Sequence, residues 1–227
     1  RTPLTVIRGE AEVTLRGKEK PISEYRATLE RIVQLSSQMN KLVGDILFLA
    51  RSESGTLQMD LKPTSLGPML EEVRRETAIL ARSQSIAVTL EGVSCEATVQ
   101  GDPERLMQLF MILTDNAVKY GRKDGSIVIR LNTSEHAVQV MVADNGLGIP
   151  EADLPHVVKR AYRVWRGRPS AVGGAGLGLP IAKWIAEAHH GDISITSTLH
   201  QGTTVTVRLP LHPVPSSQCS HEPDHAS

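Results

Sequence analysis

The sequence has few aromatic residues, only two cysteines and no excess of either charge. Aromatic side chains make up 3% of the 227 residues, so a core has to be built mainly from Leu, Ile, Val, Met and Ala. Cys95 and Cys219 show neither metal-binding nor disulfide spacing, which is typical of a reducing compartment. Lys plus Arg equals Asp plus Glu at 25 each, so the composition predicts no nucleic-acid partner and no contact with an anionic membrane.

Long apolar runs are missing as well. No apolar run approaches the roughly 18 residues of a membrane span, and no signal peptide is present. A chain of 227 residues can hold one large or two small domains with a real core. Because the chain begins with Arg1 and not with Met, we expect it to be a piece of a longer protein.

Two glycine clusters flank a basic segment in the second half of the chain. They read Asp144-Asn-Gly146-Leu-Gly148-Ile149-Pro150 and Gly173-Gly174-Ala-Gly176-Leu177-Gly178-Leu179. Glycine permits positive φ and lets a ligand lie against bare peptide groups. The second cluster runs into apolar residues at helical spacing, and the start of a helix favours phosphate. One cluster alone is a weak indication, but two clusters with an acid opening the first predict a ligand pocket.

A long amphipathic helix is predicted between Ile22 and Arg51. Its apolar residues step by three and four along the chain: Ile32, Leu35, Met39, Leu42, Ile46 and Leu49. This heptad spacing produces a narrow apolar seam, which suits a helical bundle or a coiled coil. Two helices alone bury too little surface, so we expect a partner chain to complete a four-helix bundle. The alternative is a plain helical hairpin packed on its own domain.

Another helix begins at Asp102-Pro103-Glu104, which combines a capping side chain, a proline in the first turn and an early acid. It runs to about Tyr120. One stripe faces the core and a second carries polar groups: the stripes are Leu106, Phe110, Leu113 and Ala117, and Ile112, Asn116, Lys119 and Tyr120. An amide, a cation and a phenol beside an apolar stripe are well placed to meet a nucleotide, although a solvated Asn and Lys would give the same pattern.

Shorter elements complete the prediction. Strands are expected over Leu57–Leu61, Ile86–Leu90, Ala97–Gln100, Ser126–Asn132, Ala137–Val142, Ile193–Thr196 and Gly202–Pro210, the fourth and fifth as a hairpin. A helix capped by Ser65 is expected to bury Ile79 and Leu80 among its apolar residues. His189 and His190 are interpreted as cations or exposed polar residues at a helix end, since successive helix residues point about 100° apart and cannot easily share a metal ion.

The two glycine clusters resemble the glycine boxes of sensor histidine kinases, within the wider ATPase superfamily that includes gyrase and mismatch-repair ATPases. Asp115-Asn116-Ala117-Val118-Lys119-Tyr120 resembles the asparagine box of that family. Arg1-Thr2-Pro3-Leu4-Thr5 looks like the tail of its dimerisation box, His-Glu-Leu-Arg-Thr-Pro-Leu. The resemblance implies an α+β fold, with a helical hairpin that forms a dimeric four-helix bundle followed by an ATP-binding α/β sandwich. We assign residues 1–54 to the hairpin, 55–212 to the ATP-binding domain and 213–227 to a disordered tail.

By this resemblance ATP and Mg²⁺ are the expected ligands. Asn116 offers its carbonyl oxygen to Mg²⁺, Lys119 neutralises phosphate charge, and Tyr120 bonds near the phosphates or the ribose. Asp144 accepts a hydrogen bond from the adenine amino group and Thr203 reaches the adenine, while a turn-capping role is the alternative for Asp144. The other nucleotide contacts are assigned to Gly146, Gly148, Ile149, Tyr162, Gly174, Gly176, Leu177, Gly178 and Leu179.

The segment Pro155–Pro169 corresponds to the lid of the family. Its residues 159–164 resemble a box rich in phenylalanine, but Val158 and Ala161 stand where the phenylalanines would be. Arg163 is assigned a phosphate contact or a docking role on the helical domain. A solvated basic loop is the alternative interpretation.

Ile112 is a departure from the family pattern. Many members have a second Asn at this position, so Mg²⁺ would depend here on Asn116 and water alone. ATPases of the gyrase type need a catalytic Glu at the same place, which argues against that type. A non-catalytic module that binds nucleotide and signals by dimerisation is the alternative, motivated by Ile112, the depleted lid box and Ala175.

The function implied is that of a phosphorelay kinase core. The γ-phosphate of ATP passes to the box histidine, which would lie three positions before Arg1, and then to an aspartate of a response-regulator receiver domain. Thr2 lies one turn after that histidine and is assigned the orientation of water during dephosphorylation, an ordinary kinked helix being the alternative. We expect this chain to bind ATP without phosphorylating itself, and to form homodimers. We also expect it to be the cytoplasmic portion of a membrane-anchored sensor, whose membrane contact is confined to upstream segments.

Overall fold

A computed structural model describes residues 2–16, 20–92, 97–164 and 175–212. The chain divides into two compact units, residues 1–57 and 58–227. The tail expected over 213–227 and Gly174 of the second glycine cluster lie outside the described residues.

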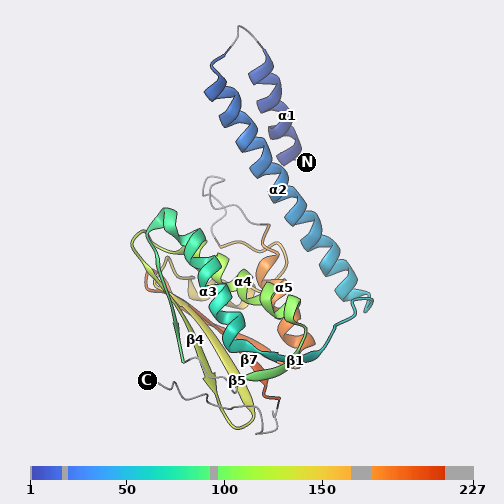
Figure 1. Ribbon diagram of the computed structural model, residues 1–227, viewed down its shortest axis with the longest axis vertical. Helices are drawn as coiled ribbons and strands as arrows, with labels where there is room; N and C mark the ends of the chain where they lie inside the picture. Colours follow the sequence, from blue (N-terminus) through green and yellow to red (C-terminus); the bar gives the residue numbers. More distant parts are fainter. Residues whose placement is uncertain (1, 17–19, 93–96, 165–174, 213–227) are drawn as a thin grey trace, which may run out of the picture. The chain divides into compact units, whose positions relative to one another are not determined.

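The first unit is a helical hairpin of α1 (Thr2–Leu15) and α2 (Ile22–Glu53), drawn in blue in Figure 1. The hydroxyls of Thr14 and Thr28 lie 3.0 Å apart across the hairpin, and Arg31 Nε lies 2.7 Å from Glu10 Oε1. Five of the six predicted seam residues are buried or half-buried, whereas Ile46 is 53% exposed. The seam therefore lies on the less exposed side of α2, except at Ile46.

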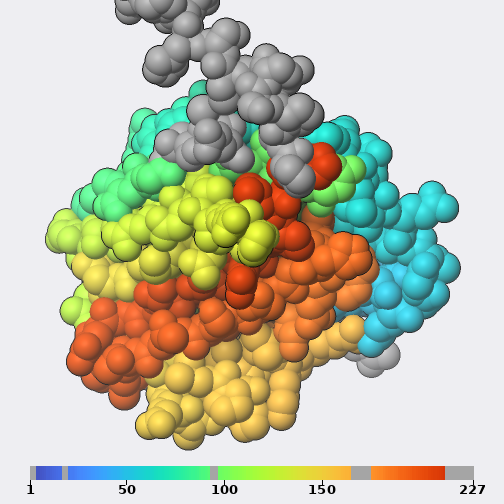
Figure 2. Space-filling view, turned by 90° about the horizontal axis from the view of Figure 1, so that it is seen from below, coloured from blue at the N-terminus to red at the C-terminus, as the bar shows by residue number. Residues whose placement is uncertain are grey.

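The second unit is built on a five-stranded mixed sheet in the order β2-β4-β5-β7-β6. Its strands are β2 (Ala87–Glu91), β4 (Ser126–Thr133), β5 (Ala137–Asp144), β6 (Asp192–Thr198) and β7 (Gly202–Pro210). Strand β2 pairs parallel with β4, and the remaining pairs are antiparallel, which confirms the predicted hairpin of β4 and β5. Figure 2 shows yellow β5, red β7 and orange β6 as adjacent bands, with the light-orange 3₁₀ segment η2 (Glu151–His156) next to β6.

Three helices cover one face of this sheet: α3 (Leu66–Ala81), α4 (Pro103–Tyr120) and α5 (Gly178–Ala188) (Figure 1). The strands alternate accordingly, so that Ile127, Ile129 and Leu131 of β4 are buried while Arg130 between them is exposed. Helix α4 begins as predicted, because the carboxylate of Asp102 accepts hydrogen bonds from the first-turn N–H groups. Its predicted core stripe is buried.

The predicted strand at Leu57–Leu61 is wrong. The strand at this point is β1 (Lys62–Ser65), which pairs antiparallel with β3 (Thr98–Gly101). Thr64 is buried there and its hydroxyl donates to the carbonyl of Gly101 at 3.0 Å. The pairing therefore follows a partner 37 residues away and not the local apolar alternation.

The predicted buried side of α3 is confirmed at Met69, Leu70 and Val73 and wrong at Ile79 and Leu80. Ile79 and Leu80 are 55% and 48% exposed, while Val73, Thr77 and Ala81 are fully buried. Buried positions four residues apart lie on one helix face, and Ile79 points away from that face while Leu80 lies beside it. Apolar character alone did not indicate which residues of the last turn meet the sheet.

Candidate functional site

Helix α4 lies between the two glycine clusters. A Cβ on Gly146 would stand 2.2 Å from the carbonyl oxygen of Tyr120, and Leu147 N–H donates to that oxygen at 3.0 Å. A Cβ on Gly178 would lie 3.1 Å from Ile112 Cγ2 and 4.0 Å from Asn116 Nδ2. Since Asn116 and Tyr120 are one helical turn apart, about 6 Å along the axis, the helix brings both clusters to neighbouring turns.

Asp144 ends β5 and opens the first cluster. Its Oδ1 accepts a hydrogen bond of 2.8 Å from Gly146 N–H, and the peptide N–H of Thr203 also donates to the carboxylate. Burial raises the pKa of Asp144 above its ordinary value, and these two hydrogen bonds oppose the rise. The carboxylate is fixed in place and half-buried, so it can accept a further hydrogen bond from a ligand.

The first glycine loop packs against the turn between β6 and β7. Gly148 has φ +66°, and a Cβ there would lie 2.1 Å from the carbonyl oxygen of Thr198. Leu147 accepts a hydrogen bond of 2.7 Å from His200 N–H, and Ile149 N–H donates to Ser197 Oγ at 2.9 Å. No motif in the sequence marked Ser197. Only the strand register, which places it opposite Thr203, could have drawn attention to it.

The second cluster contacts the lid segment. Gly176 has φ +71°, and its carbonyl accepts a hydrogen bond of 3.0 Å from Ala161 N–H. A Cβ on Gly176 would stand 2.6 Å from the carbonyl oxygen of Tyr162. The Tyr162 hydroxyl donates to the carboxylate of Asp153, and its ring lies 5.6 Å from the His156 ring. The backbone of this part of the lid is therefore tied to the helix start that carries Gly178.

The two side chains predicted to contact phosphate, Lys119 and Arg163, have different surroundings. Lys119 Nζ lies 2.5 Å from Asp115 Oδ2, so its charge is balanced within α4. Arg163 follows Tyr162 and is half-buried. The remaining predicted residue, Thr2, is the first residue of α1 in the other unit. The structure thus brings together Asn116, Tyr120, Asp144, Thr203 and the described glycines of both clusters through the contacts above.

Two family models match the chain. Residues 1–55 match the His Kinase A (phospho-acceptor) domain, and residues 101–213 match the histidine kinase-, DNA gyrase B-, and HSP90-like ATPase. The chain belongs to the sensor histidine kinases. Helix α4, both glycine clusters and strands β6 and β7 all lie in the second match.

Individual relatives agree with this family. The sensor histidine kinase YkoH of Bacillus subtilis is 36% identical over 212 residues, which are 92% of this chain and 45% of the relative. The chain spans about half the length of the curated relatives it matches. A full-length ShkA structure in complex with AMPPNP has a TM-score of 0.75 at 24% identity, covering 95% of this chain and 44% of that one. A ThkA structure in complex with the response regulator TrrA has a TM-score of 0.72 at 21% identity, covering 92% and 58%.

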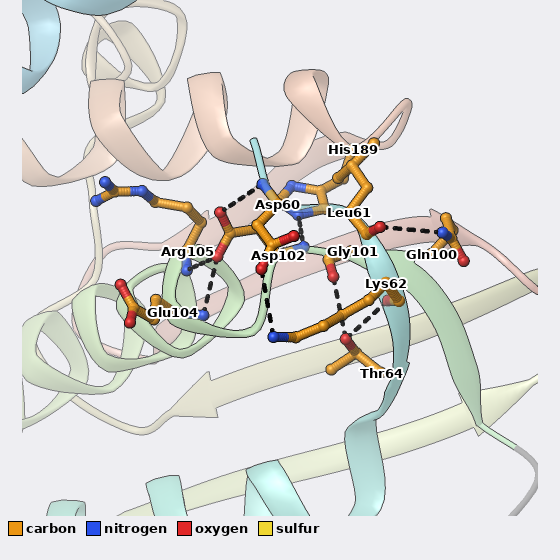
Figure 3. A network of polar contacts seen from close by, with 10 residues as sticks. All are labelled: Asp60, Leu61, Lys62, Thr64, Gln100, Gly101, Asp102, Glu104, Arg105 and His189. Carbon is orange, nitrogen blue, oxygen red and sulfur yellow. Dashed lines mark hydrogen bonds and ion pairs between the residues drawn. The ribbon is translucent and has the colours of Figure 1, made fainter. Parts of the chain in front are cut away.

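In this histidine kinase core, His189 contradicts its predicted role as an exposed or cationic residue. It is 3% exposed, and its Nε2 accepts a hydrogen bond of 2.9 Å from Asp102 N–H (Figure 3). Nδ1 must then carry the proton and donates to the carbonyl of Ile185 at 2.7 Å. Burial lowers the pKa of His189, so the ring is neutral. His190, the next residue, is exposed as expected.

The same network holds the entry of the chain into the nucleotide-binding unit. Asp102 Oδ2 accepts a hydrogen bond of 3.2 Å from the N–H of Asp60, just before β1 (Figure 3). The carboxylate of Asp102 caps α4, and its peptide N–H is bound to the end of α5 through His189. Helices α4 and α5, which adjoin the glycine clusters, are therefore both held by Asp102: α4 by its carboxylate and α5 by its peptide N–H.

The described residues contain neither a membrane-spanning helix nor a cluster of metal ligands. Over the parts of the chain that the structure covers, none of the helices combines the length and apolar character needed to cross a bilayer. Within the same parts, no group of three or more His, Cys, Asp or Glu side chains is arranged to hold a metal ion.

Proposed function

We propose that this chain is the catalytic core of a phosphorelay kinase that binds ATP beside α4 and transfers its γ-phosphate to histidine. One observation carries the proposal: Asn116 and Tyr120, one turn apart on α4, adjoin the second and the first glycine cluster respectively. A nucleotide lying along this helix turn meets an anchored carboxylate at one end and the start of α5 at the other. The family match supplies the reaction class.

Adenine lies at the Asp144 end of the proposed site. The carboxylate is held by two backbone N–H groups and keeps acceptor capacity for the exocyclic amino group of adenine. Thr203 lies opposite Asp144 in the strand register and extends the same edge of the site. Because both side chains are half-buried, a directed hydrogen bond there discriminates better than it would in open water.

The phosphates lie toward the start of α5. The peptide groups at Gly176, whose φ is positive, and at the start of α5 provide N–H donors, and Arg163 supplies charge. Lys119 adds its charge when it exchanges the Asp115 carboxylate for phosphate. Asn116 fits Mg²⁺ as one oxygen ligand, since its side chain is half-buried beside Gly178 and Ile112 adds no oxygen. Mg²⁺ prefers octahedral oxygen ligands and keeps several waters, so phosphate and water would complete its shell and the ion would neutralise phosphate charge.

Transfer itself needs a histidine nucleophile, and none of the eight histidines of this chain stands in the sequence context of the dimerisation box. A neutral imidazole nitrogen attacks the γ-phosphorus, the bond to the bridging oxygen breaks, and ADP leaves. In the dimerisation box that nitrogen belongs to the histidine three positions before Arg1. Thr2 then lies one turn along the same helix and orients water for the reverse, dephosphorylating role. The second phosphoryl acceptor is an aspartate on a response regulator, the type of partner named for the ThkA neighbour.

The hairpin is proposed to form a homodimer. Helix α2 has a second apolar stripe that is exposed in the single chain: Ile22, Leu29, Val33, Val43 and Leu47. The intervals of 7, 4, 10 and 4 residues are those of a heptad repeat. A second copy of the hairpin covers this stripe and completes a four-helix bundle.

The test extends the chain by His-Glu-Leu ahead of Arg1 and supplies γ-labelled ATP with Mg²⁺. The extended protein is expected to become labelled, whereas the same protein extended by Ala-Glu-Leu and the unextended chain bind ATP without labelling. Nucleotide binding without label in the His-Glu-Leu protein would favour the non-catalytic signalling module instead. Absence of nucleotide binding in all three proteins would refute the proposed site.

A further inference from the structure

Ser197 is the last of three side chains that lie in a row across the neighbouring strands β5, β7 and β6. The register pairs Asp144 of β5 with Thr203 of β7, and Thr203 with Ser197 of β6. All three alternate in phase with the buried or, in β6, half-buried residues of their strands, so they lie on the sheet face that carries the helices. Asp144 and Thr203 belong to the proposed adenine end of the site, and Ser197 lies behind them.

The hydrogen bonds around Ser197 have one consistent arrangement. Ile149 N–H donates to its oxygen at 2.9 Å, and the carbonyl of Gly202, which can only accept, lies 2.7 Å away. The single hydroxyl proton of Ser197 is therefore used on Gly202. The remaining contact, 2.9 Å between Ser197 Oγ and Thr203 Oγ1, then requires the Thr203 hydroxyl to donate to Ser197. Ser197 thus accepts two hydrogen bonds and donates one.

The hydrogen bonds of Ser197 determine what the Thr203 hydroxyl can offer to a ligand. With its proton directed to Ser197, Thr203 Oγ1 presents lone pairs only, next to the carboxylate of Asp144. Two adjacent acceptors match an exocyclic amino group, which carries two hydrogens. They repel a carbonyl oxygen at the same position of the base.

We propose that Ser197 is a positioning residue that sets base selectivity, by holding the Thr203 hydroxyl as an acceptor toward the 6-position of a purine. This inference rests on the proposed function, since it concerns the base of the same nucleotide. It gives a role to a residue that touches no ligand itself. Ser197 is expected to change the ratio between the affinities for a 6-amino and a 6-oxo purine nucleotide, and not only the overall affinity for nucleotides.

The experiment compares ADP with inosine diphosphate, which carries a carbonyl oxygen in place of the 6-amino group. Calorimetric titration of the full chain with Mg²⁺ is expected to give much tighter binding of ADP. In Ser197→Ala, Thr203 regains a free hydroxyl that can donate, so the ratio of the two affinities falls at least about tenfold. Ser197→Thr keeps the hydroxyl and the ratio. Ser194→Ala, on the exposed face of the same strand, leaves both affinities unchanged.

A double-mutant cycle with Thr203→Val separates positioning from a general structural role. If Ser197 acts through Thr203, Ser197→Ala lowers the affinity ratio no further in the Thr203→Val background. Equal losses for both nucleotides in Ser197→Ala, with the ratio unchanged, would overturn the inference while leaving the nucleotide site intact. Should Ser197→Ala fail to fold, Thr203→Val alone must still lower the ratio. A wild-type chain that binds neither nucleotide refutes the proposed function and this inference with it.

Discussion

The peptide N–H of Asp102 donates to the buried Nε2 of His189, 87 residues further along the chain. The bond joins the beginning of α4 to the end of α5, the two helices that adjoin the glycine clusters. It requires an unprotonated Nε2, because a protonated imidazolium would direct a second N–H at the N–H of Asp102. Two groups act electrostatically on this ring: the Asp102 carboxylate favours its protonation and His190 opposes it.

Acidification is expected to destabilise the fold through His189. Its pKa is lowered from the ordinary 6.5 by burial, so between the two values the unfolded chain binds more protons than the native one. Stability is then fully present above about pH 6.5 and decreases as the pH falls toward the lowered native pKa. Thermal unfolding between pH 5 and 8 measures this. His189→Gln retains an acceptor and flattens the decrease, while His190→Gln removes only the smallest of the influences on the His189 pKa and keeps most of the decrease.

His189→Ala is expected to lower the free energy of unfolding at neutral pH, because the buried N–H of Asp102 loses its acceptor. The unsatisfied donor alone costs about 1–3 kcal/mol, and the cavity adds to it. Denaturant unfolding of His189→Ala and His189→Gln gives the comparison. Equal stability of the two variants would show that the hydrogen bond contributes nothing.

Asp144→Asn is expected to weaken nucleotide binding without weakening the fold. Loss of a hydrogen bond to a charged acceptor lowers ADP affinity by about tenfold to a hundredfold. Burial raises the Asp144 pKa above 3.8, so native stability falls as the pH rises through that raised value, and the ionised carboxylate destabilises the empty domain at neutral pH. The amide removes this penalty. Titration calorimetry and thermal unfolding should therefore move in opposite directions, and a large loss of stability would contradict the assignment.

Asn116 and Ile112 are expected to control the Mg²⁺ dependence of binding. Asn116→Ala removes the protein ligand, so ADP affinity measured with and without Mg²⁺ should become nearly equal. Ile112→Asn adds an oxygen one turn earlier, beside Gly178, and should increase the Mg²⁺-dependent part of the affinity. If Asn116→Ala leaves the Mg²⁺ effect unchanged, the ion is held by phosphate and water alone.

Gly146→Ala is expected to destabilise the nucleotide-binding unit. The added carbon would stand 2.2 Å from the Tyr120 carbonyl, so the loop or the end of α4 must move, at a cost of about 1–3 kcal/mol. Gly44→Ala in α2 is the matched control. It meets no atom within 4 Å and should stabilise its helix by about 0.5–1 kcal/mol. Denaturant unfolding of both variants decides whether a loss of stability in Gly146→Ala comes from the contact with the Tyr120 carbonyl or from replacing a glycine as such.

Local physics was enough to predict part of this protein from its sequence. The beginning of α4 follows from Asp102 and Pro103, whose capping and fixed φ act within one turn. The hairpin of β4 and β5 follows from alternation over adjacent residues, and the heptad of α2 from its own spacing. The glycine clusters indicated a pocket because positive φ is a property of single positions, as at Gly148 and Gly176.

Only the tertiary structure decided the rest. From the sequence alone, His189 is a polar residue at a helix end. In the fold its ring is buried and accepts a hydrogen bond from the peptide N–H of Asp102, which is distant in sequence. Strand β1 forms where β3 offers a partner, and Ser197 gains its role from the register with Thr203. The reason is physical: capping, φ preference and periodicity are set by neighbours along the chain, whereas burial and hydrogen-bond direction depend on which distant groups the fold brings into contact.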